Sequence, residues 1–551
     1  MKFFIVCPRG LEAPLYQELE HVIAQCKDAQ LHTQLGLEAS QSQALQKAFA
    51  SAQLGLLPLK PTGGLEVTGG MELAMAINLY SRIASRVLIQ LIHTPYKKEE
   101  DIYATANKIS WEDWFTTEQT LRVDVTAQKS NLNSINFITL RIKDAICDRF
   151  REIKGKRPSI ETATPDARVM AFLDPTHVTI YMDSTGEALF KRGWRDEKGA
   201  APLKENLAAG ILALTGWQVD MPLFDPMCGS GTFLIEAAQI AKQIPPGAIR
   251  AGLLASEAPQ GSQAHKEPDE APPTPQKKPV PTEEEKPPPV VNTAWVAPIA
   301  VDTGKVIASP QNKPLAATKP IVPIKKPARD YTDLPYQASR VDLVGAIQGF
   351  GFLRLKPFAE KQVQQGWELI KQLAQGQMHA HADQILRIAG SDINEQMVAI
   401  TKRNWQKAGL SGIPIVRQID ALAAKSPFGE MKKTGIVVFN PPYGERLELK
   451  GGRGDQGEEK KSRGARDPLP KNISDPQFVE FLANYGRHIK EHFDGWQMDV
   501  LTADMGLPGQ LRMKETKRTP LFNGAIECRL FRFDIRKGFV KTTNDTTPEE
   551  P

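Results

Sequence analysis

Short apolar runs, separated by segments with helical periodicity, follow one another through the C-terminal half of the chain. The runs cover residues 222–225, 385–392, 413–420, 435–440 and 499–504, and the helical patterns lie near 231–243, 394–408 and 475–493. Strands and helices that alternate in this way predict an α/β domain built on a parallel, doubly wound sheet. Because ligands of such sheets bind beyond the C-terminal ends of the strands, the residues that end each run are the first candidates for a site.

A glycine-rich turn follows the first run. The string FDPMCGSGTFLIEAA places an acid at the strand end and two glycines before a helix. It lacks the third glycine of a dinucleotide fingerprint and the Lys-Ser/Thr of a P-loop, which disfavours a pyrophosphate site. An acid that accepts hydrogen bonds from an ammonium group, beside turn amides that face a carboxylate, suits the methionine end of S-adenosylmethionine. The candidate cofactor-binding residues in this string are Asp225, Pro226, Cys228, Gly229, Ser230, Gly231 and Thr232.

Two further acids end the next two runs. Asp392 stands where a carboxylate in this type of sheet accepts hydrogen bonds from ribose hydroxyls, and Asp420 could accept one from the adenine amino group. Either residue could instead cap the helix that follows it. Asp225 and Asp392 are much farther apart in the sequence than the glycine turn and the ribose-binding acid of a dinucleotide fold. The extra length predicts additional helix around 359–375.

The fourth run ends in an Asn-Pro-Pro-Tyr motif. Its candidate catalytic residues are Asn440, Pro441, Pro442 and Tyr443. The prolines fix the backbone and remove donors, so the Asn440 side chain and the Pro441 carbonyl could accept the two N–H groups of an exocyclic amine. Tyr443 could stack on an unpaired base, although the motif in isolation could also be a plain turn. Together with the glycine turn, the motif predicts methyl transfer by direct displacement, without a metal or a covalent intermediate.

The N-terminal 190 residues mix predicted strands and helices. Alternating apolar residues predict strands at 121–127 and 177–183, with an amphipathic helix between them. The side chains of this helix that are expected to face the core are Ile138, Leu140, Ile142, Ile146 and Phe150. Its end is basic, which favours either contact with RNA phosphates or a solvated face. The candidate RNA-binding residues are Lys129, Arg141, Lys154, Lys156, Arg157, Arg192 and Arg195.

Bulk composition excludes several classes of protein. Hydrophobic residues make up 41% of the 551 residues and charged residues 24%, as in soluble globular proteins, and the net charge of +5 gives a mild indication of anionic partners. The five cysteines form no C-x-x-C pair, so neither disulfides nor a metal site are expected. No segment approaches the roughly 20 apolar residues of a membrane span, and the apolar N-terminal run is too short for a signal peptide. The sequence predicts a cytoplasmic protein without membrane contact.

Two polar segments interrupt the pattern. Residues 255–335 contain 17 of the 42 prolines, so they are expected to be disordered, either as a plain tether or in contact with RNA phosphates through their basic part. Residues 448–471 indicate a flexible polar loop, which either grips nucleic acid or is a tolerated insertion. Residues 541–551 are expected to form a disordered tail.

Five strings carry a resemblance to a known family. They are RGWRDEKGAAPLKENLAAGIL, FDPMCGSGTFLIEAA, GFGFLRLKPFAE, NPPYGERL and LFNGAIECRLFRFD. The chain thereby resembles the THUMP-domain methyltransferases that make N2-methylguanine in bacterial 23S ribosomal RNA. The resemblance implies a class I (Rossmann-like) methyltransferase domain with an N-terminal α+β region. The implied parts are a ferredoxin-like part at 1–55, a THUMP RNA-binding region at 56–190, and the methyltransferase domain at 191–254 and 336–540.

The expected reaction is transfer of a methyl group from S-adenosylmethionine to the N2 atom of a guanine in 23S ribosomal RNA, either free or in a precursor particle. Because Asn-Pro-Pro-Tyr suits any exocyclic amine, an adenine-N6 methyltransferase acting on RNA or DNA is the alternative. A non-catalytic RNA-binding ribosome assembly factor is a second alternative. The sequence ends soon after the last family string, so a fused second domain that makes N7-methylguanine is not expected. The modified nucleotide and the oligomeric state stay open.

Overall fold

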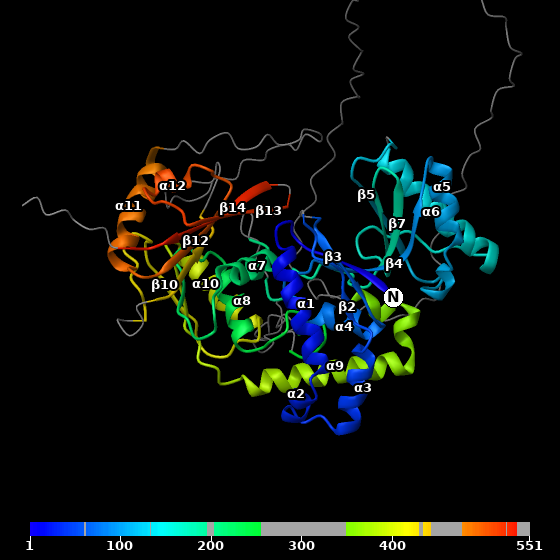
Figure 1. Ribbon diagram of the computed structural model, residues 1–551, viewed down its shortest axis with the longest axis horizontal. Coiled ribbons are helices and arrows are strands. Elements are labelled where there is room, and N and C mark those ends of the chain that lie inside the picture. The colour runs from blue at the N-terminus through cyan, green and yellow to red at the C-terminus, as the bar shows by residue number, and fades with distance from the viewer. Residues whose placement is uncertain are drawn as a thin grey trace, which may run out of the picture. The chain divides into compact units, whose positions relative to one another are not determined.

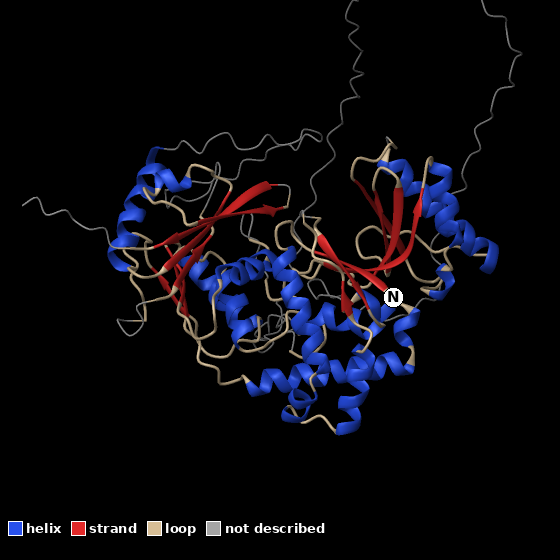
Figure 2. Ribbon diagram, in the orientation of Figure 1, coloured by secondary structure: helices blue, strands red, loops and turns tan. Residues whose placement is uncertain are grey.

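Two seven-stranded sheets organise the described part of the protein in the computed structural model (Figure 1, Figure 2). The structure describes residues 1–59, 62–132, 134–195, 203–254, 349–428, 434–441, 476–524 and 526–536. The segments 255–335, 448–471 and 541–551, for which the sequence predicts disorder or flexibility, lie outside the described residues. Within the described ranges, no helix combines the length and the apolar character needed to cross a membrane.

The N-terminal sheet has the strand order β2-β3-β1-β4-β7-β6-β5. Its strands are β1 Lys2–Val6, β2 Gln53–Leu54, β3 Gly64–Thr68, β4 Arg86–Pro95, β5 Leu121–Ala127, β6 Ala167–Leu173 and β7 His177–Asp183. Neighbouring strands are antiparallel, except for the parallel pair β5 and β6. The strands predicted at 121–127 and 177–183 are confirmed. β1 and β3, which come from the two sides of the boundary predicted near residue 55, pair with each other in this sheet.

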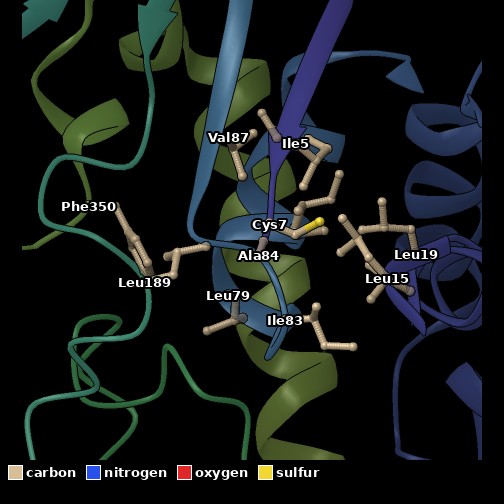
Figure 3. Packing of buried hydrophobic residues seen from close by; sticks show 14 of the residues in the cluster. Ile5, Cys7, Leu15, Leu19, Leu79, Ile83, Ala84, Val87, Leu189 and Phe350 are labelled. Atoms are coloured by element: carbon tan, nitrogen blue, oxygen red, sulfur yellow. The ribbon is translucent and has the colours of Figure 1, made fainter. Parts of the chain in front are cut away.

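Helices of the N-terminal region bury apolar faces. They are α1 Glu12–Lys27, α2 Ala29–Gln34, α3 Ala39–Phe49, α4 Met71–Tyr80, α5 Glu99–Lys108, the 3-10 turn η1 Trp111–Asp113 and α6 Ile135–Lys154. Leu15 and Leu19 of α1 belong to the same core cluster as Ile5 of β1, and Figure 3 shows these side chains together. The prediction that Leu140 of α6 faces the core is wrong. Leu140 is 50% exposed, because a residue two positions after the buried Ile138 lies on the other side of a helix.

The C-terminal sheet has the order β10-β9-β8-β11-β12-β14-β13. Its strands are β8 Leu223–Asp225, β9 Ile388–Asp392, β10 Ile415–Gln418, β11 Ile436–Phe439, β12 Gln497–Thr502, β13 Lys517–Asn523 and β14 Ile526–Asp534. The first five strands in this order are parallel, and β14 runs antiparallel to both β12 and β13. Each of the five apolar runs overlaps a strand of this sheet, so the predicted α/β domain with a parallel sheet is confirmed.

Helices cover both faces of the C-terminal sheet. They are α7 Glu205–Thr215, α8 Thr232–Ala241, α10 Glu395–Lys407, α11 Pro476–His492 and the short α12 Leu507–Gln510. In β11, Ile436 and Val438 join the apolar cluster that contains residues of α7, α8 and α10, whereas Val437 and Phe439 join the cluster around α11. The sheet is therefore doubly wound, and because its strands β10, β9, β8, β11 and β12 are parallel, their C-terminal ends lie at one edge, where ligands of such sheets bind.

Additional helical structure lies between α8 and β9. It consists of the 3-10 turns η2 Gly351–Arg354 and η3 Lys356–Ala359 and the helix α9 Lys361–Ala380, which confirms the helix predicted around 359–375. Side-chain hydrogen bonds join α9 to the N-terminal helices: Gln377 donates to Gln25 of α1 at 3.0 Å, and Gln41 of α3 donates to Gln372 at 3.3 Å. Part of the long connection between the two acidic strand ends thus packs against the N-terminal region.

Candidate functional site

The glycine turn forms a tight loop between β8 and α8. Gly229 and Gly231 have φ values of +53° and +81°, in the left-handed region that favours glycine. At Gly231 a Cβ atom would also lie 2.5 Å from Cγ2 of Thr401 on α10. Both the backbone conformation and the close packing against Thr401 therefore favour glycine at position 231. Glycines also allow the backbone of the loop to approach a ligand closely.

We expect Gly231→Ala to destabilise the protein by about 3 kcal/mol, because it adds a steric clash to the cost of a left-handed backbone. Gly229→Ala is the matched control. No atom lies within 4 Å of a Cβ built at Gly229, so this change should cost only about 1 kcal/mol. Urea unfolding of both variants measures the difference. Equal losses for the two variants would show that contact with Thr401 does not matter.

Hydrogen bonds from β9 and α10 hold the glycine loop in place. The Gly229 amide donates to the Asp392 carboxylate at 2.9 Å, and the Cys228 amide donates to the Ser391 carbonyl at 2.9 Å, both across to the end of β9. The Pro226 carbonyl accepts from the Ser391 hydroxyl at 3.3 Å. From α10, Thr401 Oγ1 donates to the Gly229 carbonyl and Asn404 Nδ2 to the Ser230 carbonyl, at 2.7 and 3.1 Å. The predicted residues Asp225, Pro226, Cys228, Gly229 and Asp392 therefore lie together, because β8 and β9 pair in parallel.

Asp225, the last residue of β8, carries a buried carboxyl group at the start of this loop. Only 2% of the residue is exposed, and its carboxylate accepts one hydrogen bond, from the Met227 amide at 3.1 Å. Burial, and secondarily the negative charge of Asp392, raise the pKa of Asp225 well above its ordinary value. Among the described residues no cationic side chain pairs with it. A positively charged ligand group would stabilise its ionised form.

The first turn of α8 has no side-chain cap. Its N-cap residue, Gly231, offers no side-chain acceptor to the helix amides, which carry the positive end of the helix dipole. Thr232 begins the helix and Ser230 precedes the N-cap. A carboxylate would satisfy these amides in the way that an N-cap side chain does elsewhere.

Asp420 lies two residues beyond β10, at the same edge of the sheet as Asp392. It is exposed, and its carboxylate accepts a hydrogen bond from the Leu422 amide at 2.8 Å. This bond belongs to a turn at 421–423, and no helix begins there among the described residues, so the alternative that Asp420 caps a helix is not borne out. The role of its carboxylate toward adenine stays a prediction, as does that of Asp392 toward ribose.

Asn440 follows β11 at the same edge of the sheet. β11 pairs in parallel with β8, which places Asn440 and Asp225 at the ends of adjacent strands. The side-chain oxygen of Asn440 is buried and has no hydrogen-bond partner among the described residues. An unsatisfied buried acceptor costs stability, and this oxygen is available to accept a hydrogen bond from an N–H donor. Pro441 is buried beside it, and Pro442 and Tyr443 lie outside the described residues.

Tyr485 of α11 is a buried polar residue near this edge that sequence reasoning missed. Its ring meets that of Phe439, the residue before Asn440, edge-on with 5.5 Å between centroids. Burial raises the pKa of the Tyr485 hydroxyl, and the charge of Asp225 adds to this effect. The hydroxyl has no partner among the described residues. The sequence signal is weak, because Tyr485 lies on the apolar stripe of α11 together with Leu482 and Ile489 and resembles an ordinary core position.

The candidate RNA-binding residues differ in their exposure to solvent. Four of them are exposed around β5 and α6: Lys129, Lys154, Lys156 and Arg157. Arg141 is partly buried, with its guanidinium carbon 4.7 Å from the centre of the Tyr103 ring. Arg192 and Arg195 instead point inward, as described next.

Arg192 is 2% exposed and cannot present its charge to RNA, so this prediction needs correction. Its Nε donates to Glu236 of α8 at 3.1 Å, and its other nitrogens donate to the carbonyls of Leu189 and Arg82 at 2.7 and 2.6 Å. Arg195 is also largely buried and donates to Ser230, Thr232 and Glu205. Both arginines therefore support α8 and the glycine loop. Sequence reasoning could not find Glu236, Ser230 and Thr232 as their partners, because these residues lie 35 to 44 positions away along the chain.

The fold is that of class I methyltransferases, a parallel sheet to which β14 adds a strand that runs antiparallel to its neighbours β12 and β13. Solved methyltransferase structures share it at low sequence identity. The protein SMU.472, complexed with SAH, matches with a TM-score of 0.60 and 20% identity over 98% of this chain and 99% of its own. A predicted N6-adenine-specific DNA methylase from Listeria monocytogenes matches with a TM-score of 0.59 and 20% identity, over 97% and 95% of the two chains.

Family models match both parts of the chain. A THUMP domain model matches residues 96–183, and an RMKL-like methyltransferase domain model, UPF0020, matches residues 192–344 and 349–455. The chain belongs to the THUMP-domain methyltransferases with an RMKL-like catalytic domain, and the predicted family and fold class are confirmed.

Curated relatives bear the name "Ribosomal RNA large subunit methyltransferase K/L". The relative from Psychromonas ingrahamii is 28% identical over 502 residues, which cover 89% of this chain and 50% of the relative. The relative from Syntrophotalea carbinolica is 29% identical over 511 residues, which cover 89% and 53%. The chain thus spans about half the length of the curated relatives that it matches.

Proposed function

We propose that the protein transfers a methyl group from S-adenosylmethionine to the N2 atom of a guanine in 23S ribosomal RNA. The observation that carries this proposal is the buried, unpartnered oxygen of Asn440 at the same sheet edge as the glycine loop. The family membership and the names of the curated relatives support it. This substrate would place the protein in the cytoplasm.

The residues present fit the methyl donor at its charged end. The buried Asp225 carboxylate suits an ammonium group, and the uncapped amides at the start of α8 suit a carboxylate. The remaining candidates, Pro226, Cys228 and Gly229, shape the loop, while Asp392 and Asp420 would serve the ribose and the adenine. When bound, S-adenosylmethionine supplies an activated methyl group.

The main contribution of the protein to the reaction would be to align the nitrogen of the base with the methyl carbon of the donor. An exocyclic amine conjugated to a base is a weak nucleophile. The Asn440 oxygen, with the Pro441 carbonyl, would accept its N–H groups and direct the nitrogen lone pair toward the methyl carbon. The new nitrogen–carbon bond forms as the sulfur–carbon bond breaks, which leaves S-adenosylhomocysteine. The extra proton on the nitrogen passes to solvent.

The N-terminal region would hold the RNA. The exposed lysines and arginine around β5 and α6 lie within residues 96–183, the stretch that the THUMP model matches. Contacts between such side chains and phosphates give affinity that falls steeply with salt. We infer that Lys129, Lys154, Lys156 and Arg157 contact the RNA backbone.

Methylation of defined substrates with labelled S-adenosylmethionine, followed by nucleoside analysis, tests the proposed function. We expect N2-methylguanosine in ribosomal RNA and no product in DNA. N6-methyladenine as the sole product would overturn the choice of base. Binding of RNA without any methylated product, from ribosomal particles or free RNA, would favour a non-catalytic assembly factor.

Binding of S-adenosylhomocysteine should weaken as the pH falls. The pKa of Asp225 is raised, so its carboxyl group becomes neutral at a higher pH than usual and then no longer attracts the ligand's ammonium group. Calorimetric titrations across a pH series measure this, and Asp225→Asn should remove most of the dependence. Methylthioadenosine, which lacks the ammonium group, is the control ligand. An equal pH dependence for both ligands would contradict the role given to Asp225.

A further inference from the structure

Arg195 joins three side chains around the glycine loop. Its Nη1 donates to Ser230 Oγ at 2.5 Å and its Nη2 to Thr232 Oγ1 at 2.8 Å, while its Nε donates to Glu205 Oε1 at 2.8 Å. The Arg195 side chain is 10% exposed and that of Glu205 is 7% exposed. The guanidinium is therefore held in one orientation inside the domain, against the loop that precedes α8.

The chemistry of these bonds sets the direction of two hydroxyl protons. A guanidinium group can only donate, so Ser230 and Thr232 must both accept from Arg195. Each hydroxyl then keeps its own hydrogen free to donate to another group. Ser230 and Thr232 flank Gly231, the N-cap residue that offers no side-chain acceptor to α8. Two hydroxyl donors thus lie beside the open amides at the positive end of the helix dipole.

We propose that Arg195 is a positioning residue, which orients the Ser230 and Thr232 hydroxyls to bind the carboxylate of the methyl donor. This inference rests on the proposed function. The ion pair with Glu205 offsets much of the positive charge of Arg195, so its contribution is mainly geometric. A lysine in its place would carry the same charge on a single nitrogen, without the planar fork that reaches all three partners.

Arg195→Lys tests the proposal through two ligands that differ at the carboxylate end. S-adenosylhomocysteine has the amino acid group and methylthioadenosine lacks it. We expect Arg195→Lys to weaken binding of S-adenosylhomocysteine by about 10- to 50-fold, which is the usual effect of losing hydrogen bonds to a charged group. Binding of methylthioadenosine should change less than about 3-fold. In kinetics, KM for the methyl donor should rise while kcat at saturating donor stays within about 3-fold.

A double variant tests whether Arg195 affects ligand affinity through the hydroxyls of Ser230 and Thr232. Ser230→Ala combined with Thr232→Val should cause a loss similar to that of Arg195→Lys, and the triple variant should lose little more, because the three residues act as one unit. Arg532→Lys is the matched control. Arg532 pairs with the buried Asp499 at 3.0 Å, between β14 and β12, and its replacement should leave the ratio of the two affinities unchanged.

The outcomes separate the inference from the proposed function. Failure of the parent protein to bind S-adenosylhomocysteine would overturn the proposed function. Normal binding by the parent, with Arg195→Lys weakening both ligands equally or neither, would overturn the positioning role alone. Additive losses in the triple variant would likewise show that Arg195 does not act through the two hydroxyls.

Discussion

Asn440→Ala is expected to lower kcat by about 100- to 1,000-fold, the usual effect of removing one well-placed hydrogen-bonding group from a transition state. The side-chain oxygen of Asn440 is buried without a partner among the described residues, so its proposed role is to accept from the substrate. Affinity for S-adenosylhomocysteine should change little, because the glycine loop is formed by other elements. Single-turnover methylation assays and calorimetry measure the two quantities.

Asn440→Asp is the matched variant, since aspartate has nearly the same shape and keeps an acceptor oxygen at this position. It should retain at least about 10 times more activity than the alanine variant. Equal activity of Asn440→Ala and the parent would remove Asn440 from the reaction. Equal loss of RNA binding and turnover would instead indicate a structural role.

Glu236→Ala is expected to destabilise the protein by about 3–5 kcal/mol, because it leaves buried arginines without their counter-charge. Glu236 is completely buried on α8 and pairs with Arg192 at 3.1 Å and with Arg82 at 3.5 Å. Burial lowers the pKa of Arg82, while the charge of Glu236 opposes this effect. The Arg82 amide also donates to Glu18 of α1 at 2.7 Å, so the network links α8 to the N-terminal region.

Urea unfolding of Glu236→Ala and of a surface control measures this effect. Glu368→Ala removes the ion pair with Lys371 on α9, in which the glutamate side chain is 60% exposed. Exposed pairs contribute little, so this control should lose at most about 1 kcal/mol. A loss below 1 kcal/mol for Glu236→Ala would show that the network is not essential to the fold.

The strands of the C-terminal sheet could be predicted because their residues carry the signal locally. In β11 four consecutive buried apolar residues, Ile436–Phe439, are typical of a strand of a parallel sheet that is covered on both faces. Strand ends were harder to place: the run at 413–420 forms a strand only at Ile415–Gln418, where three of the four residues are exposed. Burial of this edge strand depends on its neighbour β9, which local sequence does not reveal.

The candidate site was predictable where a motif lies in one stretch of sequence, as in the loop from Asp225 to Thr232. The buried arginines were not predictable, because charged residues are usually exposed and their partners come from elsewhere in the chain. Arg192 needs Glu236, and Arg195 needs Ser230 and Thr232, which approach only when α8 packs in the folded domain. Sequence patterns therefore identified the chemical groups of the loop, and the structure identified what supports them.

Mass spectrometry of 23S ribosomal RNA, from cells with and without this protein, tests the central claim most directly. We predict that one N2-methylguanosine is present in the RNA of the parent cells and is missing from cells that lack the protein. It should return when the intact protein is supplied, and stay missing when Asn440→Ala is supplied at the same level. An unchanged set of methylated guanosines in the cells without the protein would contradict the claim.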